Sequence, residues 1–304
     1  MIELDTLATE QQNTASQAID AVSTLDMVRI INAEDAKVAA AVGAIAPAVA
    51  QAVDLIAARL HDGGCLFYIG SGTSGRLGIL DAVECPPTYS TEPELVQGLI
   101  AGGYDAIFRA REGAEDSPQN GEADLKAQHI TAKDVVVGLS ASGRTPYVVG
   151  ALSYAQSIGA ATIAVDCSPH SPIAAHAQID LCALVGPEVI TGSTRMKAGT
   201  AQKMILNMLS TGTMVKLGKV YGNLMVDVKA SNKKLEERAR RIVMTVTGCT
   251  RDTAIQALQQ CQGSAKTAIV MIKNQLSASA AAAVLQHADG YLRQALQQTD
   301  KEDC

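Results

Sequence analysis

Aromatic side chains are scarce in this sequence of 304 residues. Phe, Trp and Tyr together make up 3 %, and Trp is absent. Proteins that bind single-stranded nucleic acid stack the bases on aromatic rings, so the scarcity argues against that class. The formal net charge is −6, and such an acidic chain is not expected to present the broad basic surface that a duplex requires. We therefore expect no nucleic-acid partner.

Long apolar runs are also missing. The longest uncharged apolar run covers residues 38–50, which is shorter than the roughly 20 residues that a membrane-spanning helix needs. The first residues, MIELDTLATEQQN, are polar and acidic, unlike a secretory signal peptide. These features predict a cytoplasmic protein that does not associate with a membrane.

Signatures of disulfides and metal sites are lacking as well. The number of cysteines is odd, no two are spaced as CxxC, and the five histidines are scattered without an HExxH pattern. We expect reduced, mostly buried thiols and no metal. The seven cysteines are Cys65, Cys85, Cys167, Cys182, Cys249, Cys261 and Cys304.

Hydrophobic residues, by contrast, make up 47 % of the chain and charged residues 18 %, which is typical of a globular protein. Short apolar runs that alternate with helical patterns predict an α/β fold, in which helices flank both faces of a parallel sheet. The expected strands lie at 65–70, 94–102, 134–140, 161–166 and 179–185. A helix is expected at 36–60, with Pro47 marking a kink or a boundary.

The last seventy residues change character. Short helical patterns separated by Gly248, Gly263 and Gly290 predict a small helical bundle. We expect one domain over residues 1–235 and the bundle over 236–304. The apolar, Met-rich stretch at 204–215 is too hydrophobic on all sides to face water, so it should be buried in the core or in a dimer interface.

Two expected strands are followed by similar loops, SGTSGR at 71–76 and SASGRT at 140–145. In parallel sheets ligands bind at the carboxyl ends of the strands, and hydroxyls with backbone N–H groups suit a phosphate. Alternatively, Ser and Thr only cap the next helix. GSGTSG also loosely matches the dinucleotide fingerprint, but the usual acidic residue after a second strand is missing. The candidate ligand residues are Ser71, Thr73, Ser74, Ser140, Ser142, Arg144 and Thr145.

A third candidate site is the run GPEVITGSTRMKAGTAQK at 186–203, which gathers hydroxyls and cations where a helix is expected to begin. Helix N-termini attract anions, so this run predicts part of a phosphate site, with Ser193 and Lys197 as candidate contacts. Which of its cations touches a ligand stays open. The alternative is a capped helix start with solvated Lys and Arg side chains.

These motifs resemble a known family. The two loops resemble those of the SIS (sugar isomerase) fold, which binds phosphosugars, and 186–203 resembles a signature shared by the glucokinase regulatory protein and N-acetylmuramic acid 6-phosphate etherases. The resemblance to the etherases is much closer and extends over nearly the whole chain. It includes the runs ASQAIDAVSTLDMVRIINAED, YIGSGTSGRLGILDAVECPPTY, GLIAGG, EGAEDS, GLSASGRTPYV and GNLMVDVKASNKKL. One departure is SGTSGR where the family is expected to have AGTSGR, a change that adds a hydroxyl.

The resemblance implies a cytoplasmic, homodimeric lyase of cell-wall sugar recycling with an SIS-type sheet and no cofactor. Such an enzyme cleaves the D-lactyl ether of N-acetylmuramic acid 6-phosphate with water, giving N-acetylglucosamine 6-phosphate and D-lactate. The catalytic glutamates of the family fall on Glu84 and Glu115. Elimination requires one acid and one base. Glu84, expected at the negative end of a helix stopped by Pro86 and Pro87, suits the protonated acid, and Glu115 in an acidic loop suits the base.

Two other functions remain open on the residues alone. A regulatory protein that senses a phosphosugar needs the same pocket but no acid–base pair, as in the glucokinase regulatory protein. An aldose–ketose isomerase acts on the same C2 proton, although no feature here favours it. Each glutamate is also compatible with a plain exposed position at a helix end.

Overall fold

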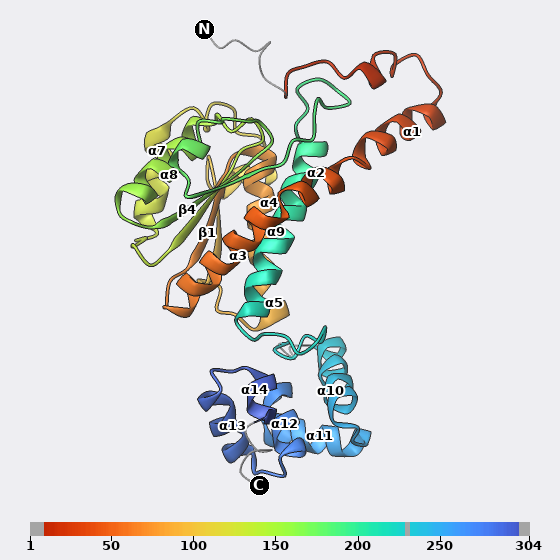
Figure 1. The fold of residues 1–304 in the computed structure, drawn as a ribbon, viewed down its shortest axis with the longest axis vertical. Coiled ribbons are helices and arrows are strands. Elements are labelled where there is room, and N and C mark those ends of the chain that lie inside the picture. The colour runs from red at the N-terminus through yellow and green to blue at the C-terminus, as the bar shows by residue number, and fades with distance from the viewer. Residues whose placement is uncertain (1–8, 229–231, 298–304) are drawn as a thin grey trace. The chain divides into compact units, whose positions relative to one another are not determined.

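The computed structural model describes residues 9–228 and 232–297, and the chain divides into two compact units. The first combines the residues up to Val83 with Glu94–Ser210, and the second combines Glu84–Pro93 with the residues from Thr211 onward. Figure 1 shows the elements of each unit. The division between residues 235 and 236, which we expected from the sequence, stays a prediction about where separately folding domains meet.

A five-stranded parallel sheet forms the centre of the first unit, in the order β2-β1-β3-β4-β5. Every residue of β1, β3 and β4 is buried, as expected for apolar strands covered on both faces. The five strands expected from the sequence are confirmed. They are β1 Leu66–Gly70, β2 Val96–Ile100, β3 Val135–Leu139, β4 Ala161–Asp166 and β5 Ile179–Cys182.

Helices cover both faces of this sheet, as predicted (Figure 1). On one face, α7 (Pro118–Ala127) and α8 (Pro146–Ser157) pack together, and Phe67 and Ile69 of β1 share their apolar core. On the other face, α4 (Gly72–Val83) lies over β1, where the hydroxyl of Tyr68 donates to Asp81 at 3.1 Å. Alternate residues of one strand therefore contact different helix layers.

Three helices precede the sheet: α1 (Thr24–Asp35), α2 (Val38–Ala44) and α3 (Ala46–His61). Pro47 lies in the first turn of α3, and the segments Thr24–Ala44 and Ala46–His61 are bent by 60°. Proline is tolerated in a first turn because those N–H groups have no partner within the helix. The boundary expected at Pro47 is confirmed.

Membrane-spanning helices were sought over the same described ranges. No single helix there is long and apolar enough to cross a membrane. Two bent helix pairs meet the requirement by length and composition only, Thr24–Ala44 with Ala46–His61 and Ala265–Lys273 with Ala278–His287.

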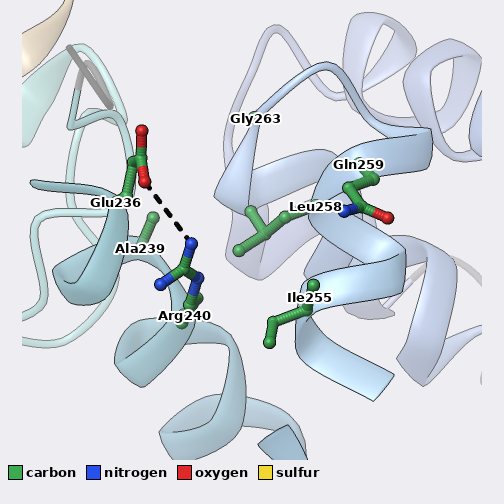
Figure 2. A pocket seen from close by; sticks show the side chains of 7 residues that line it. All are labelled: Glu236, Ala239, Arg240, Ile255, Leu258, Gln259 and Gly263. Carbon is green, nitrogen blue, oxygen red and sulfur yellow. Dashed lines mark hydrogen bonds and ion pairs between the residues drawn. The ribbon is translucent and has the colours of Figure 1, made fainter. Parts of the chain in front are cut away.

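The second unit contains the expected bundle of short helices. Polar side chains at Asn232, Thr250, Ser264 and Ser277 each accept a backbone N–H at the start of a helix. A cavity of about 240 Å³ lies between α10 and α11, and Figure 2 shows Arg240 paired there with Glu236. The helices are α10 Lys233–Thr247, α11 Arg251–Gln260, α12 Ala265–Lys273, α13 Ala278–His287 and α14 Leu292–Gln297.

None of the six cysteines within the described residues forms a disulfide. Cys85, Cys167 and Cys261 are buried, and burial raises the pKa of Cys167 and Cys261, which keeps them as neutral thiols. Cys304 lies outside the described residues. The reduced state of the thiols stays a prediction.

Candidate active site

The two hydroxyl-rich loops meet because β1 and β3 are neighbours in the sheet. Gly70, the last residue of β1, pairs with Leu139, the last residue of β3. The chain leaves β1 toward β2 on one side and reaches β3 on the other, so the strand order reverses at this point. Such a reversal leaves a crevice at the carboxyl ends of the strands. The loops 71–76 and 140–145 lie there.

Two glycines let these loops pack closely. A Cβ atom on Gly75 would come within 2.8 Å of the Gly70 carbonyl oxygen and 2.6 Å of Ile100 Cγ1. Gly143 has a φ of +67°, and a Cβ there would lie 2.2 Å from the Cβ of Ser171. Only glycine fits both positions without movement of the backbone or its neighbours.

These loops line a cavity of about 250 Å³, which we call the hydroxyl cavity. Six of the predicted ligand residues line it, so the structure brings both loops to one site. The only charged side chains among the described lining residues are the carboxylates of Glu10 and Glu115. The lining residues are Thr9, Glu10, Ser71, Gly72, Thr73, Ser74, Glu115, Ser140, Ala141, Ser142, Thr145, Gly192 and Thr194.

Hydrogen bonds fix several of these hydroxyls. Ser71 Oγ donates to Glu115 Oε2 at 2.5 Å. Ser140 Oγ and Thr145 Oγ1 lie 2.9 Å apart. Ser74, which is 8 % exposed, donates to Gln202 Oε1 at 2.9 Å, so its oxygen is held at the cavity wall. The hydroxyls are therefore oriented before any ligand binds.

Three polar side chains of the lining were not among the predicted contacts: Thr9, Glu10 and Thr194. Thr9 is 4 % exposed, and its Oγ1 has no hydrogen-bond partner within the described chain. No local pattern marks Thr9 or Glu10, because they reach the site through contacts with loops far away in the sequence. Thr194 lies in the run 186–203, and only its immediate neighbour Ser193 was chosen.

A second cavity of about 210 Å³ adjoins the first, and we call it the arginine cavity. It shares Ser71, Gly72 and Glu115 with the hydroxyl cavity, so these residues form a common wall. Sequence reasoning missed this cavity, although Arg76 belongs to the loop motif. The lining residues are Ser71, Gly72, Arg76, Ala101, Ala106, Ala110, Arg111, Glu112, Gly113 and Glu115.

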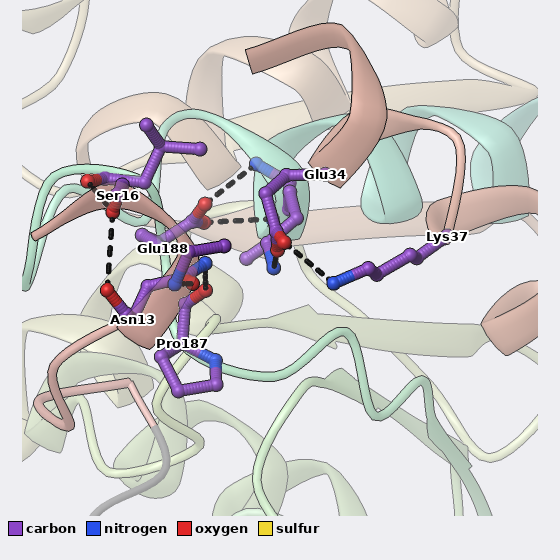
Figure 3. A network of polar contacts seen from close by, with 10 residues as sticks. Asn13, Ser16, Glu34, Lys37, Pro187 and Glu188 are labelled. Carbon is purple, nitrogen blue, oxygen red and sulfur yellow. Dashed lines mark hydrogen bonds and ion pairs between the residues drawn. The ribbon is translucent and has the colours of Figure 1, made fainter. Parts of the chain in front are cut away.

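Two of the three cations in the run 186–203, Lys197 and Lys203, have partners within the chain. Figure 3 shows Glu34 and Glu188 in the network of polar contacts around this run. Helix α9 (Lys197–Lys216) begins in this run, and the backbone N–H groups of Lys197 and Ala198 both donate to the Glu188 carboxylate at 2.9 Å. Lys197 Nζ donates to Glu34 Oε2 at 2.6 Å, and Lys203 Nζ to Asp81 at 2.8 Å. The anion at this helix N-terminus is thus a side chain of the protein itself.

This network also fastens the N-terminal segment. Asn13 Nδ2 donates to the Pro187 carbonyl at 3.0 Å, and Ser16 Oγ donates to the Val189 carbonyl at 2.7 Å. Burial of Glu34 opposes its ionisation, but hydrogen bonds from Lys197, Lys37 and Asn13 outweigh that effect and lower its pKa to about 2. The carboxylate is therefore a permanent anion at neutral pH.

Three predicted contacts, Arg144, Ser193 and Lys197, are not among the residues that line the hydroxyl cavity. Lys197 is 1 % exposed and ion-paired with Glu34, a partner that the sequence pattern did not indicate. Arg144 is exposed, and its backbone N–H donates to Ser142 Oγ at 3.3 Å. The placement of Lys197 supports a structural role, and substrate contact by these three residues stays a prediction.

Comparison with known proteins identifies the family. The chain is 56 % identical over 295 residues to an N-acetylmuramic acid 6-phosphate etherase of Pectobacterium atrosepticum, covering 97 % of each protein. It is 54 % identical over 301 residues to the enzyme of the same name from Clostridium beijerinckii, covering 99 % of each. The chain belongs to the N-acetylmuramic acid 6-phosphate etherase family. The resemblance read from the sequence is confirmed, and the regulatory alternative is not favoured.

The etherase-family chain also matches two broader family models. Residues 48–156 match the glucokinase regulatory protein N-terminal SIS domain, and residues 108–212 match the SIS domain. The predicted fold class is confirmed by this match and by the parallel sheet. A solved phosphoheptose isomerase from Francisella tularensis is 15 % identical, covers 64 % of this chain and 100 % of its own, and has a TM-score of 0.49.

Glu84, one of the two glutamates expected to be catalytic in this etherase family, directly follows α4 and takes the N-cap position of α5 (Cys85–Tyr89). We expected Pro86 and Pro87 to stop a helix. Instead they lie in the first turn of a new one, where proline is tolerated. Glu84 therefore adjoins the negative end of α4 and the positive end of α5. The two helix dipoles oppose each other there, so they do not distinguish an acid from a base at this position.

Glu115 is exposed in the loop before α7 and belongs to the first unit. Its side chain is held by Ser71, and its backbone carbonyl accepts the N–H of Tyr147 at 3.0 Å. Across residues 9–228 and 232–297, no group of three or more His, Cys, Asp or Glu side chains is placed to hold a metal ion. Metal-independent catalysis stays a prediction.

Proposed function

We propose that this protein cleaves the D-lactyl ether of N-acetylmuramic acid 6-phosphate with water, giving N-acetylglucosamine 6-phosphate and D-lactate. The identity of 56 % over 97 % of both chains carries the proposal. The hydroxyl cavity at the strand ends supports it, because hydroxyls and N–H groups at the start of α4 suit the phosphate of a sugar.

The chemistry follows from the open-chain form of the sugar. The C1 aldehyde acidifies the C2 proton, and the ether oxygen on C3 is a β-leaving group. A base removes the C2 proton, the C3–O bond breaks, and an acid protonates the departing lactate oxygen. Water then adds across the double bond, with hydroxyl at C3 and hydrogen at C2. Each positioned carboxyl contributes about 10²–10⁴-fold to the rate.

We assign the base to Glu115 and the acid to Glu84. The position of Glu115 supports its role as the base. Glu115 lines both cavities, and its carboxylate accepts a hydrogen bond from the Ser71 hydroxyl. For Glu84 the support is the sequence resemblance to the family, and the residue belongs to the second unit with the helical bundle.

Assembly and location are proposed with the activity: a cytoplasmic homodimer that acts in recycling of cell-wall sugars. The lack of disulfides among the described cysteines supports a reducing compartment. Ile190 and Met208, which are 52 % and 36 % exposed in the single chain, support a partner surface on the first unit.

Incubation with N-acetylmuramic acid 6-phosphate, followed by an assay of D-lactate, tests the activity. Binding without release of D-lactate would restore the sensor alternative. Proton NMR in D₂O separates the two glutamates. Glu84→Gln should still exchange C2–H for deuterium without cleavage, because deprotonation precedes departure of the lactate, whereas Glu115→Gln should lose both. The opposite pattern would exchange the two roles, and normal turnover in both variants would exclude the two-carboxylate mechanism.

A further inference from the structure

The arginine cavity has no role in the reaction described so far. It shares a wall with the hydroxyl cavity, formed by Ser71, Gly72 and Glu115. A molecule whose reacting carbon lies beside Glu115 can therefore extend one end into each cavity. A volume of about 210 Å³ has room for several heavy atoms, since one water occupies about 30 Å³ in the liquid.

The two cavities differ in charge. The described lining of the hydroxyl cavity includes Glu10 and Glu115 as its only charged side chains, whereas the arginine cavity adds two guanidinium groups. Arg76 is held in place, because its Nε donates to the Ile107 carbonyl at 2.9 Å and its Nη2 to the Ala106 carbonyl at 2.7 Å. These bonds fix the plane of a group with five N–H donors.

Arg111 lies in the loop between α6 (Asp105–Phe108) and α7, and the same loop carries Glu115. Its side chain is 53 % exposed and pairs with Asp105, whose side chain is 68 % exposed. An exposed pair of this kind contributes little to stability, so Arg111 can exchange Asp105 for a ligand at small cost. Glu112 and Glu115 also line this cavity, and the two arginines offset their charge for an incoming anion.

The substrate of the proposed reaction carries two anionic groups, which are joined to C3 by different branches. The phosphate is on C6, and the lactyl ether on C3 ends in a carboxylate. A planar guanidinium matches a carboxylate through two parallel N–H bonds. We propose that the arginine cavity binds the carboxylate of the departing lactyl group, and that Arg111, supported by Arg76, determines specificity for a substrate that carries it. This assignment rests on the proposed function.

The product provides the decisive comparison, because N-acetylglucosamine 6-phosphate keeps the phosphate and lacks the lactyl group. Arg111→Gln should raise KM for N-acetylmuramic acid 6-phosphate by about tenfold to a hundredfold, the range for a charge-assisted contact. Its kcat should change by less than about threefold, because the contact is made alike in the ground and transition states. Its inhibition constant for N-acetylglucosamine 6-phosphate should stay within about twofold of wild type.

Arg109→Gln is the matched control. It removes the same charge from the same segment, at an exposed residue that lines neither cavity. Arg109→Gln should leave both KM and the inhibition constant for the product unchanged. If the loss of any one cation were enough to weaken binding, both variants would show the effect. A substrate with a neutral lactamide in place of the carboxylate extends the test. Wild type should bind it about as weakly as Arg111→Gln binds the acid, and Arg111→Gln should bind both forms alike.

Three outcomes overturn the proposal. An unchanged KM in Arg111→Gln excludes the contact. Equal weakening for substrate and product places the phosphate, not the lactyl carboxylate, beside Arg111. Equal effects of Arg109→Gln and Arg111→Gln would show that the net charge of the loop, and not a direct contact of Arg111, changes KM. Release of D-lactate by wild type is measured first, and its absence would refute the proposed function instead.

Discussion

Lys197→Met removes the buried cation that pairs with Glu34. Both side chains are almost fully enclosed, at 1 % and 4 % exposure, and Nζ and Oε2 lie 2.6 Å apart. Methionine approximates the length of lysine, so the variant leaves little cavity and chiefly removes charge. Breaking one side of a buried ion pair costs about 3–5 kcal/mol, because the remaining charge loses its partner. Glu34 keeps Lys37 and Asn13 as partners, which favours the lower end, about 3 kcal/mol.

The pH dependence reports the combined effect of all the partners of Glu34. The pKa of Glu34 lies at about 2 instead of its ordinary 4.5, which corresponds to roughly 3 kcal/mol of stability. Because the pKa is lowered in the folded state, this stability is present above pH 4.5 and is lost as the pH falls toward 2. In Lys197→Met the pKa of Glu34 rises, so the destabilisation should be larger at pH 7 than at pH 4.

Hydrogen exchange with mass spectrometry is the suitable assay, since it reads peptides of the first unit separately from those of the bundle. Faster exchange is expected in peptides that cover α1 and the start of α9, with residues 233–297 unaffected. The double variant Glu34→Gln/Lys197→Met should recover part of the loss, because no buried charge is left alone. Unchanged exchange at pH 7 combined with a raised KM would refute the structural role and make Lys197 a substrate contact.

Four further outcomes are expected. Ser142→Ala should raise KM by about tenfold with kcat nearly unchanged, because a phosphate contact is the same in ground and transition states; a collapsed kcat at constant KM would assign Ser142 another role. Gly75→Ala should lower the free energy of unfolding by about 1–3 kcal/mol in guanidinium titrations, since its Cβ would press on the Gly70 carbonyl. EDTA should leave D-lactate release unchanged, and restoration of lost activity by zinc or magnesium would contradict this. Light scattering at micromolar concentration should give the mass of a dimer. A monomeric mass with activity intact would contradict this prediction.

Local patterns in the sequence determined most of the fold. Continuous apolar runs such as VVVGL and ATIAVD are buried on both faces, which is the environment of a central parallel strand. Alternation with helical stretches then implies a parallel sheet, and the strand-to-helix loops must lie at its carboxyl edge. The hydroxyls of Ser71 and Ser140 were predictable for this reason, because their position depends only on the strand that each follows.

The long-range contacts of charged side chains were decided by the tertiary structure alone. Lys197 and Glu34 are 163 positions apart, and no periodicity links them. Viewed locally, Lys197 is a cation at a helix start, where an external anion and an internal carboxylate are equally suitable partners. Only the folded chain shows that Glu188 and Glu34 occupy those positions. The common wall at Ser71 and Glu115 has the same origin, since it joins segments that the sheet brings together.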